Sequence, residues 1–188
     1  MPSSAFSAAD FKIFDVTGFQ ARMSEIRGRV RPKLEAAKHA RRTVNPPDDT
    51  WVAFTSNERG YKKHPHFKVA VSRSCMRFLF EIGPEHADKK RWAAAWKRSA
   101  PKLAPVLRRV KGLAWFKSEH DEEAAAALSD MSPEQLAGLA DELTRTRDGQ
   151  FVVGRIVPAS DAAHWTEAQY REAALETFRA LAPLYRLR

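Results

Sequence analysis

The sequence predicts an α+β fold, with a single compact domain in which a largely antiparallel sheet of about five short strands packs with helices. Short segments of alternating polarity follow one another in hairpin order, and helical segments precede, separate and follow them. The strict strand–helix alternation of a doubly wound sheet is missing. The length of 188 residues suits one domain over residues 1–188.

Two helices are expected before the first strand. Ser7 is a cap for a short helix over residues 8–14, and Thr17 is a cap for a longer one over residues 18–37. In the longer segment, apolar residues recur at spacings of three and four, which predicts one buried stripe. The segment 45–49 contains two prolines flanked by Asn and Asp, and it is expected to be a loop.

Five segments have the pattern of strands. Two of them alternate strictly, and only three residues separate them, which predicts an antiparallel hairpin. The expected strands are residues 51–55, 66–72, 76–82, 113–117 and 151–157.

Helix is expected again from about residue 85. Trp92 and Trp96 lie on one side of the helical wheel together with leucines and valines, Val106 among them, and basic residues occupy the other side. Pro101 and Pro105 are expected to divide this segment into two helices, because an internal proline removes a backbone hydrogen bond.

Two further helices have clear start signals. Ser132-Pro133-Glu134-Gln135 combines an N-cap, a proline at the first helical position and an acid in the first turn, and this helix is expected to end near Arg145. Thr166 is expected to cap the last helix. One face of that helix carries Tyr170, Ala174, Phe178 and Leu181.

The charge is unevenly distributed. The net charge is +9, but residues 1–117 hold 25 basic and 10 acidic residues (+15), whereas residues 118–188 hold 7 and 13 (−6). Residues 89–117 contain ten basic residues and no acid. This asymmetry favours a polyanionic partner. The alternative is a solvated surface on which the basic part faces the acidic part.

The composition excludes several classes of protein. With Cys75 as the single cysteine, a disulfide framework or a cysteine-based zinc cluster is excluded. No apolar run approaches the roughly 20 residues of a membrane span, and the N-terminus lacks a signal-peptide pattern, so a cytoplasmic protein without membrane association is expected. Phosphate-binding glycine loops and a nucleophile elbow are missing, and no cofactor is expected.

The densest functional pattern lies in residues 38–47 and 59–66, where basic residues, an aromatic and three histidines gather. Arginine binds phosphate through a planar fork, and tyrosine can stack on a base. The predicted phosphate contacts are Lys38, Arg41, Arg42, Arg59, Lys62 and Lys63, with Tyr61 for stacking, Asn45 and His66 as polar readers, and His39 within the same patch. The alternative is that Arg41 and Arg42 pair with Asp48 and Asp49 to hold the loop.

The histidines permit two other hypotheses. His64 and His66 alternate on a strand, so both imidazoles could reach one metal ion, with His39 or Asp48 as a third ligand. Such pairs are common by chance, and no metal site is expected. Alternatively, His39, His64 or His66 could be the acid or base of a metal-free enzyme. The acidic run at residues 119–123 is expected to be a solvated turn, and Cys75 to be inert.

The residues of this patch resemble a known family. Residues 38–54, with Asn57, Arg59-Gly60-Tyr61-Lys62 and Pro65-His66-Phe67, closely resemble the YktB-like family of bacterial proteins. Flanking matches lie at residues 9–14, 31–35 and 181–185. The resemblance implies a compact single-domain α+β fold, leaves the activity open and transfers no catalytic residue. This chain has a shorter connection than typical members between residues 31–35 and Lys38.

The leading hypothesis is a protein that binds single-stranded DNA or RNA through this basic, aromatic-containing patch. Single strands are preferred to duplex DNA because no helix-turn-helix or basic zipper is evident. One alternative is a histidine-dependent enzyme that acts on RNA or on a phosphorylated small molecule. The other is a scaffold protein whose basic part docks an acidic partner.

Overall fold

The computed structural model describes residues 48–55 and 60–187, so the helices expected at 8–14 and 18–37 lie outside the described residues. The described residues form a six-stranded sheet of order β1-β2-β3-β6-β4-β5, in which all neighbours are antiparallel. The strands are β1 (Asp49–Phe54), β2 (His66–Ser72), β3 (Cys75–Ile82), β4 (Ala114–Phe116), β5 (Ala126–Ala127) and β6 (Phe151–Pro158). The predicted α+β fold is confirmed.

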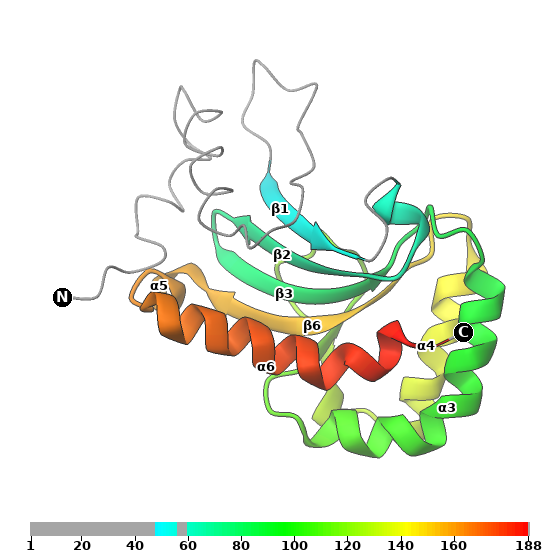
Figure 1. Cartoon of the computed structure of the whole chain (residues 1–188). Coiled ribbons are helices and arrows are strands. Elements are labelled where there is room, and N and C mark those ends of the chain that lie inside the picture. Colours follow the sequence, from blue (N-terminus) through cyan, green and yellow to red (C-terminus); the bar gives the residue numbers. More distant parts are fainter. Residues whose placement is uncertain (1–47, 56–59, 188) are drawn as a thin grey trace.

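Helices cover one face and one end of this sheet (Figure 1). Helix α6 (Glu167–Tyr185) runs along the sheet, and α3 (Lys89–Arg109) and α4 (Pro133–Arg145) lie side by side at one end of it. The remaining short elements are η2 (Tyr61–Lys63), η3 (Leu128–Asp130) and α5 (Ala159–Ala162). No helix among the described residues is long and apolar enough to cross a membrane.

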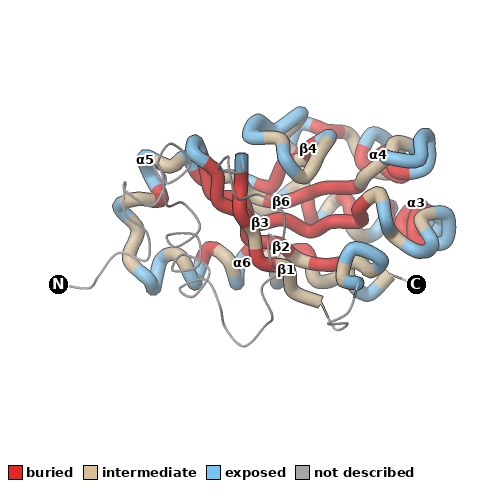
Figure 2. Tube along the Cα trace, turned by 90° about the horizontal axis from the view of Figure 1, so that it is seen from above, coloured by how far each residue is buried: buried red, intermediate tan, exposed pale blue. Residues whose placement is uncertain are grey.

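The predicted hairpin is confirmed as β2–β3. Its register pairs Phe67 with Phe80 and Val69 with Phe78, so the apolar side chains of both strands lie on the same face. This face packs on the helices and forms two apolar clusters, one around Trp92 and Trp96 and one around Phe78. Figure 2 shows the central strands buried and the outer parts of the helices exposed.

Both predicted helix starts are confirmed by capping boxes. The Ser132 side chain accepts a hydrogen bond from the backbone N–H of Gln135, whose side chain accepts one from the N–H of Ser132. Thr166 and Gln169 make the same reciprocal pair at the start of α6. Each box satisfies two backbone donors that a helix start leaves unpaired.

The prediction that Pro101 and Pro105 separate two helices is wrong. Helix α3 continues past both prolines and changes direction part-way along its length (Figure 1). Ala100 and Ala104 are fully buried, so packing holds the helix together where hydrogen bonds are lost, and the prolines bend it. Val106, predicted on the apolar side, is 56% exposed.

The sheet has one more strand than expected. The two-residue strand β5 pairs with β4 and lies in the alanine-rich segment after the acidic run. Alanine has low strand propensity and no alternation is visible in a run of alanines, so the pattern carries no signal of this strand.

Candidate nucleic-acid interface

Four strand ends meet at one end of the sheet. The start of β2 pairs with the end of β3, the end of β3 pairs with the start of β6, and the end of β4 also pairs with the start of β6. The segments that enter or leave these strands are therefore gathered in space. They include η2, the start of α3 and the connection from α4 to β6, seen at the right of Figure 1.

These gathered segments are rich in basic residues. Segments 61–63, 83–91 and 142–150, together with residue 117, hold four acidic residues: Glu85, Asp88, Glu142 and Asp148. They hold eight basic residues, here called the basic rim: Lys62, Lys63, Lys89, Lys90, Arg91, Lys117, Arg145 and Arg147.

Hydrogen bonds tie the three segments of the rim together. The N–H of Ala87 donates to the Lys63 carbonyl at 3.1 Å, which joins η2 to the segment before α3. The ammonium of Lys89 donates to the carbonyls of Arg147 and Gly149, both at 2.6 Å, which joins α3 to the segment before β6. The rim is therefore one connected surface built from residues distant in the sequence.

Most of the rim charge faces solvent. Lys62 lies 3.4 Å from Glu85, and Arg145 pairs with Glu142. Among the described residues, no ion pair involves the other exposed side chains, which are Lys63, Lys90, Arg91, Lys117 and Arg147. These five cations are available to an anionic ligand.

The basic side of α3 extends this surface. Trp92 and Trp96 are 2% and 0% exposed, which places the opposite, basic side of the helix in solvent. The interpretation of α3 as a basic outer face over a buried tryptophan stripe is confirmed, and insertion of these tryptophans into a membrane surface is not compatible with their burial.

The structure describes part of the patch predicted from the sequence. Tyr61, Lys62, Lys63 and His66 are described. The other predicted members lie outside the described residues: Lys38, His39, Arg41, Arg42, Asn45 and Arg59.

Two described members are committed to other contacts. The hydroxyl of Tyr61 accepts a hydrogen bond from the Trp51 indole at 2.9 Å, and its ring meets that of His66 edge-on at 5.1 Å. His66 is 1% exposed, with Nε2 3.2 Å from a Glu81 carboxylate oxygen and Nδ1 2.9 Å from the His64 carbonyl. The His66 ring is therefore not part of the exposed surface, and its role as a reader of bases stays a prediction.

The alternative roles of these residues are also constrained. The His66 ring is enclosed, so it does not share an open site with His64, and no cluster of three or more metal-ligating side chains occurs among the described residues. Asp49, considered as a partner for Arg41 or Arg42, contacts Arg77 and His120. Arg41 and Arg42 lie outside the described residues, so their pairing with Asp48 and Asp49 stays a prediction.

The sheet face opposite the helices carries buried charge that the sequence analysis missed. Lys68 and Arg77 are both fully buried there, and neighbouring strands β1 and β3 supply Asp49 and Glu81. Together with His66, Glu119 and His120, these residues are here called the charge network. Burial of so many ionisable groups is costly unless each is paired.

The segment 117–125 lies against this face and completes the network. Glu119 pairs with Lys68, and the Glu119 backbone carbonyl accepts a hydrogen bond from Arg77 at 2.8 Å. The Asp121 carbonyl accepts another from Arg77 at 3.1 Å, and the Ser74 hydroxyl donates to Glu122 at 2.5 Å. The predicted solvated turn at 119–123 is wrong for Glu119, whose side chain is 15% exposed.

His120 is the network member most open to solvent. Its Nδ1 lies 3.1 Å from an Asp49 carboxylate oxygen, and 56% of its side chain is exposed. The hydrogen bond to Asp49 raises the pKa of His120, with the charges of Asp49 and Glu119 in support, while burial opposes it. Burial alone would raise the pKa of Asp49, but His120, Lys68 and Arg77 together lower it.

The pKa of the buried Glu81 carboxyl group is also lowered. Burial alone would raise the pKa of its carboxyl group, but the contact with His66 and the charge of Lys68 outweigh burial and lower it. At the rim, burial and the nearby His64 hold the pKa of His86 below its ordinary value of 6.5. His86 is therefore expected to be neutral at neutral pH and to add no charge to the rim.

The His120–Asp49 contact predicts a pH-dependent contribution to stability. A histidine whose pKa is raised on folding stabilises the fold fully below its unfolded value, here 6.5, and loses that contribution as pH rises through the folded pKa. We expect His120→Ala to destabilise the protein at about pH 5.5 and to have less effect at about pH 8.5. Because the ring is half exposed, the difference should stay below about 1 kcal/mol.

Urea unfolding of both proteins at the two pH values measures this effect. His164→Ala removes an exposed histidine and is the matched control. If His120→Ala lost the same free energy of unfolding at both pH values, the assigned contact with Asp49 would be contradicted. The same pH dependence in His164→Ala would contradict it too.

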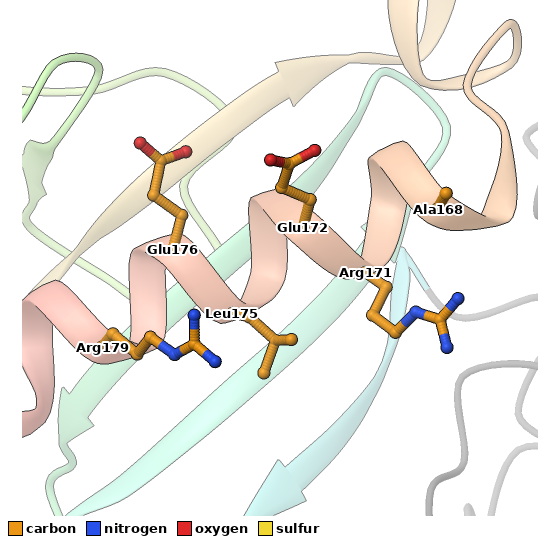
Figure 3. A pocket seen from close by; sticks show the side chains of 6 residues that line it. All are labelled: Ala168, Arg171, Glu172, Leu175, Glu176 and Arg179. Atoms are coloured by element: carbon orange, nitrogen blue, oxygen red, sulfur yellow. The ribbon is translucent and has the colours of Figure 1, made fainter.

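A second surface feature, a hollow, lies on the outer side of α6. Six residues of this one helix line a hollow of about 540 Å³: Ala168, Arg171, Glu172, Leu175, Glu176 and Arg179. Figure 3 shows Glu172 and Glu176 on one side of the helix and Arg171, Leu175 and Arg179 on the other. Leu175 is 44% exposed. The charges of this face are mixed, so it is a weaker site for a polyanion than the basic rim.

Comparison with known proteins shows the family. Residues 35–185 match the family described as "Domain of unknown function (DUF1054)". The chain belongs to this family. A UPF0637 protein of Macrococcus caseolyticus is 32% identical, with 96% of this chain and 97% of the relative covered. UPF0637 proteins of Bacillus licheniformis and Staphylococcus epidermidis are each 30% identical, with at least 97% of each chain covered. The resemblance to the YktB-like family is thereby confirmed.

Proposed function

We propose that this DUF1054 protein binds single-stranded DNA or RNA across the basic rim. The observation that carries the proposal is the convergence of η2, the start of α3 and the α4–β6 connection at one end of the sheet. Four exposed cations from these segments, and Lys117 directly after β4, have no ion pair with a carboxylate among the described residues. Phosphate groups are the anions that repeat along a chain and match several separated cations at once.

The shape of the rim favours a single strand over a duplex. The cations come from turns and from a helix start rather than from one helix that projects to fill a major groove. Single strands follow such irregular surfaces and expose their bases for stacking. A cytoplasmic location, where RNA and DNA are available, is part of this proposal. Residues 38–45 and Arg59 remain candidates to extend the interface.

The test is the binding of labelled single-stranded RNA, single-stranded DNA and duplex DNA between low and physiological salt. Lys90→Ala/Arg91→Ala removes two unpaired rim cations, and we expect weaker binding at low salt. Each phosphate contact to a single strand contributes about 0.7 to the slope of log affinity against log salt concentration, so the slope should become shallower by about 1.4.

The matched control removes the same charge elsewhere. Arg171→Ala/Arg179→Ala neutralises two exposed arginines of α6, away from the rim, and should leave the slope unchanged. Arg41→Ala/Arg42→Ala tests the predicted extension of the patch in the same assay. Binding whose affinity does not change with salt concentration would refute the proposal. If the rim variant and the α6 variant lost the same affinity, binding would depend on net charge and not on the rim.

A further inference from the structure

A cavity opens beside the basic rim, at the edge of the sheet. It has a volume of about 460 Å³ and lies between β4, the last turn of α4 and the segment before β6. Its lining combines one aromatic ring, two cations, two acids, two uncharged polar side chains and one glycine: Trp115, Lys117, Glu142, Arg145, Thr146, Asp148, Gly149 and Gln150. A cavity of this size is within the range of small-molecule sites.

The lining matches the chemistry of a nucleotide. Trp115 supplies the aromatic surface on which a base can stack, and Lys117 supplies an exposed ammonium for the attached phosphate. Thr146 and Gln150 supply hydroxyl and amide groups that can hydrogen-bond to a base edge. An apolar ligand would gain little from so polar a wall.

Trp115 also carries an unsatisfied donor. Its indole N–H is buried and has no hydrogen-bond partner among the described residues. An unpaired buried donor is costly and rare in folded proteins. This N–H is itself enclosed, so a ligand in the cavity does not reach it without a movement of the side chain.

The wall of the cavity is held in place from two sides. A side chain at Gly149 would place its Cβ 2.5 Å from the Leu143 carbonyl oxygen, so only glycine permits this close approach to the end of α4. Lys89 holds the same segment by its bond to the Gly149 carbonyl. The Glu119 N–H donates to the Gln150 side chain at 3.2 Å, which links the wall to the charge network.

The cavity is therefore continuous with the proposed interface. Lys117 and Arg145 belong both to the rim and to the lining of the cavity, and Lys89 joins the segment before β6 to the start of α3. We propose that this cavity receives one nucleotide, with its base against Trp115 and its phosphate toward Lys117. The inference rests on the proposed function, because the nucleotide is expected to belong to a single strand bound along the rim.

Trp115→Leu is the decisive variant, with a labelled oligouridylate and an oligoadenylate as probes. Loss of the stacking surface should weaken binding about tenfold. The salt slope should stay unchanged, since no phosphate contact is lost. Trp115→Phe keeps an aromatic ring for stacking and should lose less affinity than Trp115→Leu. Lys117→Ala should instead lower the slope by about 0.7.

Photocrosslinking of the wild-type protein to 5-iodouridine-substituted RNA guards against misfolding of the variants. The expected crosslink lies on Trp115 or on its cavity neighbours. Crosslinks confined to other surfaces would overturn the inference. So would tight, salt-dependent binding that neither Trp115→Leu nor Lys117→Ala alters, although the proposed function would then stand.

Titration with UMP and AMP separates a free nucleotide from a nucleotide within a strand. If oligonucleotides do not bind but mononucleotides do, and Trp115→Leu abolishes that binding, the cavity assignment holds and the strand-binding function fails. If neither class of probe binds, both the proposed function and the cavity assignment fail.

Discussion

Replacement of Arg77 by alanine is expected to destabilise the protein by about 3–5 kcal/mol, the range found when one partner of a buried ion pair is removed. Arg77 is fully buried, and its guanidinium donates to the Asp49 carboxylate at 2.7 Å. It also donates to the carbonyls of Glu119 and Asp121. The variant would leave a buried carboxylate without the nearer of its two ion-pair partners and two carbonyls without a donor.

This loss of stability should lower the urea concentration at the midpoint of unfolding and leave unchanged the slope of the free energy of unfolding against urea concentration. Arg109→Ala, which removes an exposed arginine at the end of α3, is the control and should stay within about 0.5 kcal/mol of wild type. Arg77→Ala combined with Asp49→Asn should cost less than the sum of the two single changes, because the two residues interact directly. An Arg77→Ala cost as small as that of the control would mean that the charge network does not hold segment 117–125.

Local patterns were sufficient where the stabilising contacts are themselves local. The β2–β3 hairpin was predictable because a connection of two or three residues cannot join two strands in any other way and because apolar side chains alternate on both strands. Helices α4 and α6 were predictable because each capping box lies within four consecutive residues. In each case the residues that make the contact are close in the sequence.

The charge network was not predictable by the same means. Lys68 and Glu119 are 51 residues apart, and Arg77 reaches carbonyls 42 and 44 residues further along the chain. One signal was present in the sequence: His66 and Lys68 alternate with apolar residues in a strand, as do Arg77 and Glu81. Polar residues at such positions ordinarily indicate a solvated face. Among the described residues, segment 117–125 covers that face and pairs with Lys68 and Arg77.

The basic rim was predictable in part: its residues were evident from the sequence, but their proximity in space was not. The excess of basic residues in the segment 89–117 was evident from the sequence, and so was the basic run at Lys62 and Lys63. Their proximity follows from the sheet order, in which β6 lies between β3 and β4. That order is set by long-range pairing, and no short motif specifies it.

The same long-range packing gives a second large expected effect, at Trp96. Its side chain is fully buried, stacks with Trp92 at 6.4 Å between ring centres and meets Phe151 edge-on at 5.5 Å. The indole N–H donates to the Leu136 carbonyl of α4 at 3.0 Å. Trp96 therefore joins β6 to α3 and α4, the two helices that carry Lys89, Lys90, Arg91 and Arg145 of the rim. Trp96→Ala should cost about 3–5 kcal/mol, the usual range for truncation of a large buried aromatic residue.

Thermal unfolding with matched variants distinguishes packing from surface effects. Trp96→Phe keeps most of the buried volume and should cost less than Trp96→Ala. Lys97→Ala removes the adjacent, half-exposed lysine, whose ion pair with Asp141 is open to solvent, and should cost less than about 1 kcal/mol. Because Trp96 lies beneath the rim and does not belong to it, Trp96→Ala should weaken RNA binding only at temperatures where the fold is lost. Weaker binding by a fully folded Trp96→Ala protein would mean instead that the spacing of α3 and α4 sets the affinity of the rim.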